Sequence, residues 1–425
     1  MTARIAAIQT VHSERGAKMG IELEQAVDII RANISPCKGI ELATIDNLTG
    51  RICAQDVFSP IGLPPFHRSP LDGYALRAAD SAGASKESPV SLTVMEEITA
   101  GHCPRKSVEP GTAIRLMTGA PIPEGADCVI RQEETDMGGA RVRLFRALAP
   151  FENFCHKGED IALGALLVGL GDPLSYVDAG ILAGAGVASV SVYRKPRVLL
   201  LDTGDELWDR SRGPLPSGKI FSSNHALLSA RLRAFGVQVL RIGPCPDESA
   251  AIAQTITDVA RDGDLVITTG GVSVGCKDLL PEAMAQLGAD ILFHGVNLKP
   301  GTPAMFSLFG GLPILSLSGN PFAAITTMEL LARPALAILS RNKGLELAYG
   351  EGILQGDFPK ASPGRRFIRA FERDGAIRLP VGLHASGVLG SMRGCNCLLD
   401  IPAGTGPLKT GDKVRLARLT ITGAE

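Results

Sequence analysis

Four loops in the second half of the chain combine glycines with side chains that could bind or act on a ligand, and each follows a short apolar segment. In chain order they are Asp202-Thr203-Gly204-Asp205-Glu206, Gly243-Pro244-Cys245-Pro246-Asp247-Glu248, Thr268-Thr269-Gly270-Gly271-Val272-Ser273-Val274-Gly275 and Ser318-Gly319-Asn320-Pro321. Short continuous apolar runs are typical of strands buried on both faces of a sheet. Because ligands of open α/β sheets bind outside the carboxyl ends of the strands, we expect all four loops to line one site.

Two of these loops are suited to binding an anion. The glycines of 268–275 allow positive φ, so backbone N–H groups can converge on one point. The segment 318–321 leads into an expected helix with Pro at its first position, which leaves free N–H groups and the positive end of the helix dipole at the site. One glycine-rich loop is more often a simple tight turn, but two on one edge predict a phosphorylated ligand. Lys299 would lie near the same edge and neutralise phosphate, or else be a solvated lysine.

Acidic side chains are expected at this edge too: Asp205, Glu206, Asp247 and Asp278. Carboxylates beside phosphate-binding loops indicate a divalent cation, and Mg²⁺ takes one or two carboxylates together with phosphates and water. We expect Asp247 and Asp278 to be the metal ligands. In the alternative interpretation, Asp205 is a helix cap or a solvated residue, and Asp278 caps the helix that begins near Leu279.

The elements that must position these loops alternate between strand and helix. The expected strands are 198–201, 237–242, 265–268, 291–296 and 313–317, and the expected helices are 222–235, 248–261, 279–287 and 321–339. Alternation at this spacing is typical of βαβ units and predicts a central, open, parallel sheet.

The rest of the chain is expected to form smaller modules. A helical period covers 21–33, and 59–77 is a turn-rich run with several prolines. Residues 89–147 alternate short β-like runs with Gly and Pro turns, which predicts a β-rich module. Residues 350–422 show the same pattern and predict a small β-barrel or sandwich. The fold class is therefore α/β plus β, in several domains.

Composition excludes several classes of protein. The 43 basic and 44 acidic residues give a net charge of −1, so the chain is not a polycationic nucleic-acid binder. With 45% hydrophobic and 20% charged residues it is not globally disordered. The nine cysteines include no C-x-x-C, and Cys395 and Cys397, expected on one face of a strand, do not suit a zinc knuckle. Reduced thiols, no apparent signal peptide and an apolar stretch (181–192) too short for a membrane predict a soluble, cytoplasmic protein.

Together these residues resemble the molybdopterin molybdenumtransferase family (MoeA-like), which is related to the C-terminal domain of gephyrin. The resemblance covers nearly the whole chain. The segments that carry it are Leu63–Ala75, Met117–Asp127, Thr203–Leu207, Gly270–Gly275, Lys299–Gly301 and Gly319–Pro321. Each segment alone is a modest signal, but their order and spacing together are specific.

The resemblance implies a homodimer of four-domain chains. The implied domains are an elongated N-terminal/linker domain (15–58 and 150–192), a β-rich domain (59–149), an α/β molybdopterin-binding domain (193–340) and a C-terminal β-barrel (345–425). The implied active cleft lies between the α/β domain of one subunit and the β-rich domain of the other. In the implied reaction adenylylated molybdopterin and molybdate bind, molybdenum is inserted into the dithiolene, and AMP is released with Mg²⁺ present.

The resemblance also implies the site residues. The catalytic set would be Asp72, Thr118, Glu206, Asp247, Asp278 and Lys299, with Asp72 and Thr118 supplied by the β-rich domain. The set that binds the pterin substrate would be Thr203, Gly204, Gly270, Gly271, Ser273, Gly275, Ser318, Gly319, Asn320 and Pro321.

The chain departs from the family pattern at several positions. It has Gly295 and Thr302 where many members have Lys, and Ser318 where the family has Pro. It also has Cys276-Lys277-Asp278 in place of an acidic pattern and Asn153-Phe154-Cys155 in place of Asn-x-Arg. Fewer lysines predict weaker anion binding, with Arg369 as the first substitute cation, although a lone Arg on a surface strand is more often solvated.

Two alternative functions stay open. One is a catalytically weakened paralogue that acts as a pterin-binding or scaffold protein. The other is a hydrolase that acts on a nucleotide through the same α/β domain, against which the segment Ser69–Gly73 argues.

Overall fold

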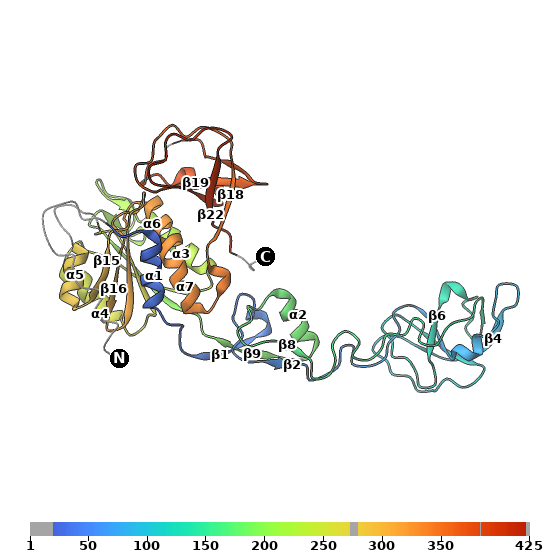
Figure 1. The fold of residues 1–425 in the computed structure, drawn as a ribbon. Coiled ribbons are helices and arrows are strands. Elements are labelled where there is room, and N and C mark those ends of the chain that lie inside the picture. The colour runs from blue at the N-terminus through green and yellow to red at the C-terminus, as the bar shows by residue number, and fades with distance from the viewer. Residues whose placement is uncertain (1–19, 273–278, 383, 422–425) are drawn as a thin grey trace, which may run out of the picture. The chain divides into compact units, whose positions relative to one another are not determined.

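The computed structural model describes residues 20–272, 279–382 and 384–421 (Figure 1). Over this range the chain forms two compact units. The larger unit contains residues up to 41, residues 50–52 and residues from 193 onward, and the smaller unit contains residues 42–49 and 53–192. The four domain boundaries expected from the sequence stay a prediction.

An open six-stranded sheet forms the centre of the larger unit. Its strands are β10 (Arg197–Thr203), β13 (Gln238–Cys245), β14 (Leu265–Thr269), β15 (Asp290–His294), β16 (Met305–Phe309) and β17 (Leu312–Leu317). They lie in the order β13-β10-β14-β17-β16-β15, and the first four are parallel. The open sheet is confirmed, but the expectation of a wholly parallel sheet is wrong, because β16 runs antiparallel to β17 and β15. The cause is a hairpin in which Gly310 and Gly311, both at positive φ, join β16 directly to β17.

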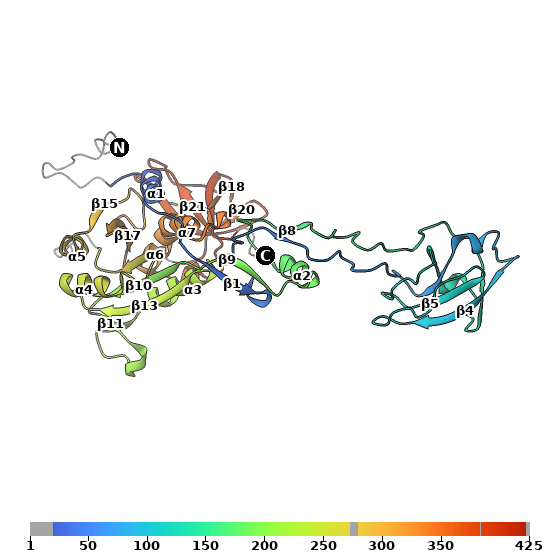
Figure 2. The same cartoon turned by 90° about the horizontal axis from the view of Figure 1, so that it is seen from below.

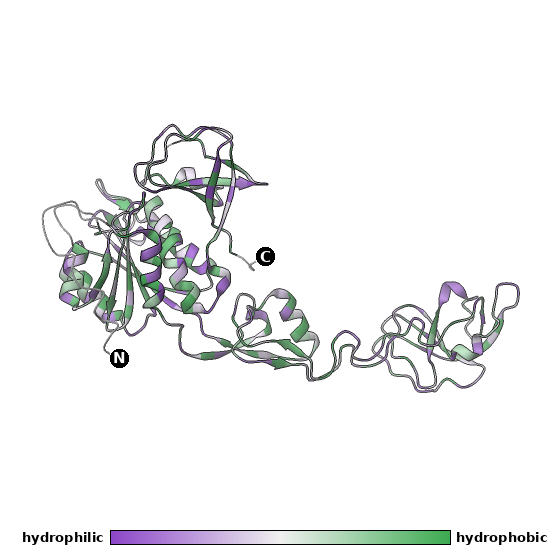
Figure 3. Ribbon diagram, viewed as in Figure 1, coloured by the Kyte–Doolittle hydropathy of each residue, from purple (hydrophilic) through white to green (hydrophobic). Residues whose placement is uncertain are grey.

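Helices cover both faces of this sheet (Figures 1 and 2). The layer on one face is α1 (Leu23–Ala32), α3 (Ser223–Ala234), α6 (Pro321–Thr327) and α7 (Arg333–Ser340), and the layer on the other is α4 (Ser249–Val259) and α5 (Leu279–Leu287). Strand β10 is apolar because it is buried on both sides: Val198 and Leu200 pack against the first layer, and Leu199 and Leu201 against the second. The central strands are accordingly mostly hydrophobic in Figure 3.

The single helix expected over 321–339 is interrupted. Between α6 and α7 the chain forms a π-helical turn, Met328–Ala332. Pro334 explains the break, because it lacks the N–H that would donate to the carbonyl oxygen four residues earlier. The stretch Pro321–Ser340 is long and apolar enough to cross a membrane by length and composition, but 94% of its apolar window is buried inside the protein.

A small closed barrel of five strands lies near the C-terminus and confirms the predicted barrel. Its strands are β18 (Ala348–Leu354), β19 (Arg366–Arg373), β20 (Ala376–Arg378), β21 (Cys397–Ile401) and β22 (Lys413–Arg418). Cys397 begins β21, but Cys395 precedes that strand, so the two thiols do not share a strand face as expected. The barrel contacts the α/β layers through Arg365, whose Nη1 lies 2.7 Å from the Glu24 carboxylate of α1.

The smaller unit is built on a five-stranded sheet with the order β6-β3-β5-β4-β7. These strands are β3 (Gly73–Leu76), β4 (Val90–Ile98), β5 (Thr112–Leu116), β6 (Cys128–Arg131) and β7 (Arg141–Leu144). Strand β3 lies inside the expected turn-rich run, where its four residues are all buried. Two two-stranded ribbons and helix α2 (Tyr176–Gly184) follow this sheet: β2 (Val57–Phe58) with β8 (Leu166–Val168), and β1 (Ile40–Thr44) with β9 (Ser189–Tyr193).

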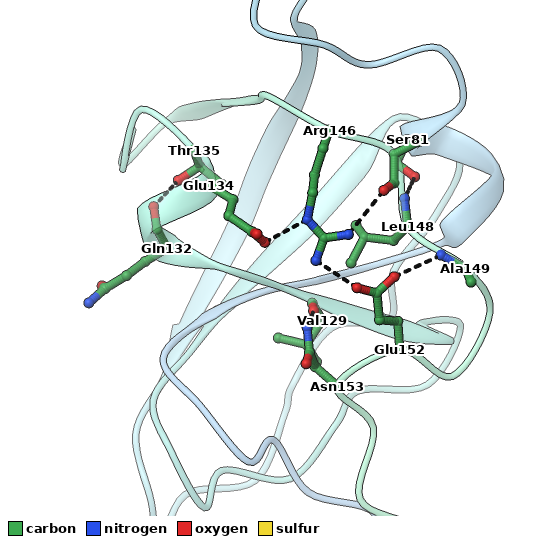
Figure 4. A network of polar contacts seen from close by, with 11 residues as sticks. Ser81, Val129, Gln132, Glu134, Thr135, Arg146, Leu148, Ala149, Glu152 and Asn153 are labelled. Atoms are coloured by element: carbon green, nitrogen blue, oxygen red, sulfur yellow. Dashed lines mark hydrogen bonds and ion pairs between the residues drawn. The ribbon is translucent and has the colours of Figure 1, made fainter.

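Arg146 ties the segment after β7 to the rest of this sheet (Figure 4). Its Nε lies 2.8 Å from Glu134 Oε2, and its Nη2 lies 2.6 Å from Glu152 Oε1. The neighbouring Asn153, at φ +53°, donates from Nδ2 to the carbonyl oxygen of Val129 at 2.9 Å. The start of Asn153-Phe154-Cys155 is thus anchored to β6 by the asparagine side chain.

Candidate functional site

A cavity of about 980 Å³ lies at the carboxyl ends of β10, β14 and β17 in the larger unit. All four loops expected from the sequence contribute to its wall. The predicted site residues that line it are Thr203, Glu206, Asp247, Gly270, Gly271, Lys299, Ser318, Gly319, Asn320 and Pro321. The prediction that these loops meet at one sheet edge is therefore confirmed, whereas the chemical role of each residue stays a prediction.

Three predicted residues, Ser273, Gly275 and Asp278, lie outside the described residues. Gly204 is buried next to the cavity without being part of its lining. Its backbone N–H donates to the carbonyl oxygen of Cys245 at 3.4 Å, so it joins the ends of β10 and β13.

Asn224 in the first turn of α3 locks two of the loops together. Its Nδ2 donates to Thr269 Oγ1 and to the carbonyl oxygen of Gly319, both at 2.8 Å. Thr269 Oγ1 in turn donates to the carbonyl oxygen of Ser318 at 3.2 Å. Asn224 was not predicted as a site residue, because its partners are far away along the chain. Its place just after Ser222, the N-cap of α3, was the only local signal.

The loop before α6 differs from its expected form. Asn320 donates its backbone N–H to Ser318 Oγ at 3.2 Å, and Phe322 donates its own to the carbonyl oxygen of Ser386 at 3.0 Å. These two N–H groups are therefore engaged with the protein, and the expectation that they are free for an anion is wrong. The physical reason differs between the two: Asn320 finds its acceptor in its own loop, whereas Phe322 finds its acceptor in the barrel loop, outside the α/β fold.

The carboxylates at the cavity have separate positions. Glu206 and Asp247 belong to its lining, together with Asp202 of β10. Asp205 does not line it. Its Oδ1 accepts the backbone N–H of Asp247 at 3.2 Å, so it fixes the loop that carries Asp247. Asp205 is thus neither a helix cap nor a purely solvated residue.

Lys299 lines the cavity and is held by its main chain. Its N–H donates to the carbonyl oxygen of Arg365 at 2.9 Å, and its own carbonyl oxygen accepts the N–H of Phe367 at 2.7 Å. No ion pair involves its ammonium group within the described ranges, so the cation is available to a ligand. Thr302 lines the same cavity, but Gly295 does not: it sits at φ +99° with its N–H donated to Ala304. Of the two positions that have lost a lysine, only Thr302 is thus in the cavity lining, and whether both positions face the ligand stays a prediction.

Arg369 is fully buried, which corrects the expectation of a solvated surface arginine. Its guanidinium carbon lies 3.6 Å from the ring centroid of Phe322, the second residue of α6. It donates to the carbonyl oxygens of Ala385 and Val388 and to Ser391 Oγ. Arg369 therefore holds the barrel loop whose Ser386 and Gly387 line the cavity. Ser386 and Gly387 were not predicted as site residues, since no local sequence pattern marks them.

Asp72 and Thr118 meet in the smaller unit. Asp72 Oδ1 accepts the backbone N–H of Thr118 at 2.6 Å and its hydroxyl at 2.8 Å. These two hydrogen bonds hold the pKa of Asp72 below its usual range, so this exposed carboxyl group is ionised at neutral pH. The structure brings the two residues together as a pair.

Comparisons with known proteins add the following matches. Three family models match successive parts of the chain: the MoeA N-terminal region (domain I and II) at 21–186, a probable molybdopterin binding domain at 200–338 and the MoeA C-terminal region (domain IV) at 351–419. The chain is 36% identical over 383 residues to molybdopterin molybdenumtransferase of Bacillus subtilis, which covers 88% of this chain and 89% of that protein. It is 34% identical over 397 residues to the Staphylococcus epidermidis protein of the same name, with 93% and 94% covered.

A solved structure agrees with these sequence matches. The crystal structure of a molybdopterin biosynthesis MoeA protein from Pyrococcus horikoshii superimposes with a TM-score of 0.79 at 30% identity, covering 95% of this chain and all of that one. Sequence and fold are thus similar over nearly the full length of these relatives. The chain belongs to the molybdopterin molybdenumtransferase family.

Proposed function

We propose that this protein inserts molybdenum from molybdate into adenylylated molybdopterin and releases AMP. The observation that supports this most directly is the cavity of about 980 Å³, whose lining joins glycine-rich loops, carboxylates and a lysine at one sheet edge. A ligand with an anhydride of two phosphates and two planar ring systems matches a cavity of that size and lining. The relatives named above are molybdopterin molybdenumtransferases.

In the proposed mechanism the chain positions its substrates more than it reacts with them. The backbone N–H of Gly271 binds a phosphate oxygen, and Lys299 neutralises its charge, whereas the N–H of Gly270 donates to the carbonyl oxygen of Leu317 at 3.4 Å and fixes the loop. Asn224 keeps this loop in register with the loop at Gly319 through its two hydrogen bonds of 2.8 Å. Fixed donors are effective because they need no reorganisation when charge moves during the reaction.

Mg²⁺ fits the donor set of this cavity. Glu206 and Asp247 line it together, and within the described ranges no cluster of three or more His, Cys, Asp or Glu side chains could hold a metal alone. That matches a cation that takes one or two carboxylates and completes its shell with phosphate and water. Asp247, with Asp278, would hold the ion, which would offset phosphate charge. Chelation with EDTA should accordingly lower the affinity for AMP.

We further propose a cytoplasmic homodimer that binds neither nucleic acid nor membrane. The ribbon of β2 and β8 supports a second copy as partner, because its register partners Phe58 and Leu166 are 56% and 55% exposed. In the dimer the partner subunit's Asp72 and Thr118 would complete the cavity. The eight described cysteines are free thiols, as is usual in a reducing compartment.

The test is turnover by the purified protein. Adenylylated molybdopterin, molybdate and Mg²⁺ are mixed with the protein, and AMP is quantified against a reaction without molybdate. We expect AMP release that depends on molybdate. Tight binding of the adenylylated pterin without AMP release would indicate a pterin-binding protein instead, and the proposed activity would be wrong.

A further inference from the structure

Asp202 is a buried carboxyl group in the lining of the cavity, and neither the catalytic set nor the pterin-binding set expected for the family includes it. It lies near the end of β10, is 1% exposed, and belongs to the cavity lining. Strand alternation places it on the same face as Val198 and Leu200, beneath the first turn of α3. An acid in this position replaces what would otherwise be one more apolar core residue.

One oxygen of Asp202 is anchored by α3. Its Oδ2 accepts a hydrogen bond from Ser222 Oγ at 2.8 Å and lies 3.6 Å from His225 Nδ1. Ser222 Oγ also accepts the backbone N–H of His225 at 3.1 Å, and Ser229 Oγ lies 3.4 Å from His225 Nε2. These contacts fix the plane of the carboxyl group. Burial raises the pKa of Asp202, and the Ser222 hydrogen bond opposes that change.

The other oxygen is buried without a partner. Asp202 Oδ1 is inaccessible to solvent in the protein and makes no hydrogen bond to any described residue. A buried carboxylate oxygen left in this state is unfavourable, because it has lost its water and gained no donor. A donor brought by a bound ligand would remove that penalty, so the protein gains binding free energy at this atom only when the correct ligand is present.

The chemistry of the group indicates what it would bind. The ionised phosphates of an anhydride and the molybdate dianion have no donor to offer and would be repelled by the carboxylate. A ring amine, ring N–H or sugar hydroxyl is the suitable donor. Next to Asp202 the wall is apolar: Leu207 of β11 (Leu207–Trp208), and Ile220 and Phe221 of β12 (Ile220–Phe221), line the same cavity. A planar heterocycle that packs against Phe221 would present its polar edge toward Asp202.

We propose that Asp202 is a substrate-binding residue whose Oδ1 accepts a hydrogen bond from an N–H or O–H group on an uncharged part of the adenylylated pterin. The inference rests on the proposed function and names which part of the substrate this wall recognises. Asp202 selects the heterocyclic or sugar part, whereas the glycine-rich loop and Lys299 hold the phosphates. Both the pterin and the adenosine carry suitable donors.

Equilibrium binding measurements, which need no catalytic activity, distinguish recognition of the neutral part of the substrate from binding of its phosphates. Adenylylated molybdopterin, AMP and molybdate are titrated separately into the wild type, Asp202→Ala and Asp202→Asn. The control is Asp264→Asn, which removes a carboxylate paired with Arg194 at the opposite edge of the same sheet. That control should unfold more easily and bind all three ligands normally.

We expect Asp202→Ala to weaken the binding of adenylylated molybdopterin at least tenfold without weakening the binding of molybdate, which the carboxylate repels. The affinity of Asp202→Asn for adenylylated molybdopterin should lie between those of Asp202→Ala and the wild type, since the amide oxygen still accepts a hydrogen bond. If Asp202→Ala does not fold, the comparison is made with Asp202→Asn alone. If Asp202→Ala also binds AMP tenfold more weakly than the wild type, the donor lies on the adenosine. If its affinity for AMP is unchanged, the donor lies on the pterin.

The inference is overturned if Asp202→Ala binds the adenylylated pterin as the wild type does, or if molybdate weakens equally. If the wild type does not bind adenylylated molybdopterin, the proposed function itself is refuted, and the inference about Asp202 is refuted with it. Thermal unfolding gives a second criterion. A purely structural Asp202 predicts destabilisation in Asp202→Asn, whereas relief of a buried, half-partnered carboxylate predicts equal or greater stability.

Discussion

Replacing Gly270 with Ala should damage the anion-binding loop far more than the same change at Gly288. Gly270 has φ +99°, and a Cβ built there would lie 2.3 Å from the carbonyl oxygen of Thr203 and 2.7 Å from its Oγ1. Thr203 ends the neighbouring strand β10, which is buried on both faces and cannot yield easily. Gly288 also has positive φ, +68°, but its Cβ position has no described atom within 4 Å.

Gly270→Ala and Gly288→Ala both incur backbone strain, but only Gly270→Ala also incurs a steric clash. An alanine in a left-handed conformation costs about 1–2 kcal/mol, which applies to both positions. The clash with Thr203 adds the cost of overpacking, about 1–3 kcal/mol. We therefore expect Gly288→Ala to lower the free energy of unfolding by about 1–2 kcal/mol and Gly270→Ala by about 2–5 kcal/mol. Moving the loop by about 1 Å should also lower turnover about 100-fold in Gly270→Ala.

Urea denaturation measures the first quantity, and molybdate-dependent AMP release measures the second. Both variants place an alanine at positive φ, so the difference between the two alanines reports mainly the close approach of the loop to β10. The φ of +99° at Gly270 lies farther from the allowed left-handed region than the +68° at Gly288 and adds to that difference. Equal losses of stability in both variants, or normal turnover by Gly270→Ala, would show that the loop accommodates a side chain. The account of a rigid phosphate-binding loop would then be refuted.

Four further predictions concern the carboxylates and the lost lysine. Asp278→Asn should lower molybdenum insertion at least tenfold, about 1.4 kcal/mol of transition-state stabilisation, with folding intact; unaltered turnover would leave Asp278 as a helix cap. Mixing Asp72→Ala chains with Asp278→Asn chains should restore activity above that of either variant if the site is shared between subunits, and no gain would contradict sharing. Thr302→Lys should tighten molybdate binding and steepen its salt dependence, whereas a flat response would mean that this position does not face the anion. Burial raises the pKa of Asp264, but the Arg194 guanidinium and the backbone N–H of Arg197 together hold it below its usual range. The stability lost in Asp264→Asn at neutral pH should therefore shrink as pH falls through that lowered pKa, as urea titrations at several pH values would detect.

The sequence was most informative where a local pattern determines the structure. Short apolar runs predicted the buried strands, and their order predicted which loops meet at the cavity. Strand β16 was missed because its five residues lie between two turns, although Gly310-Gly311 is a strong hairpin signal. That omission made the sheet appear wholly parallel.

The remaining errors concern contacts between distant segments. Arg369 looked like a solvated residue because its partners, Phe322 and the loop beginning at Ala385, are 47 residues before it and 16 after it. Gly295 and Thr302 are close in the chain, but only Thr302 reaches the cavity. A family pattern says which residue types occur at a position, whereas backbone direction decides whether a side chain there faces the ligand.

The described lining of the cavity carries more negative than positive charge, which is unfavourable for binding an anion. Three carboxylates, Asp202, Glu206 and Asp247, line the cavity, and Lys299 is the single cation among its described residues. Such a lining repels phosphate and molybdate unless a cation accompanies them or backbone N–H groups outweigh the carboxylates. Mg²⁺ at Asp247 would reverse that balance locally, while Asp202 remains suited to a neutral donor. If the proposed ion binds at Asp247, anions would be held beside it and Lys299, and a neutral donor would be held at Asp202.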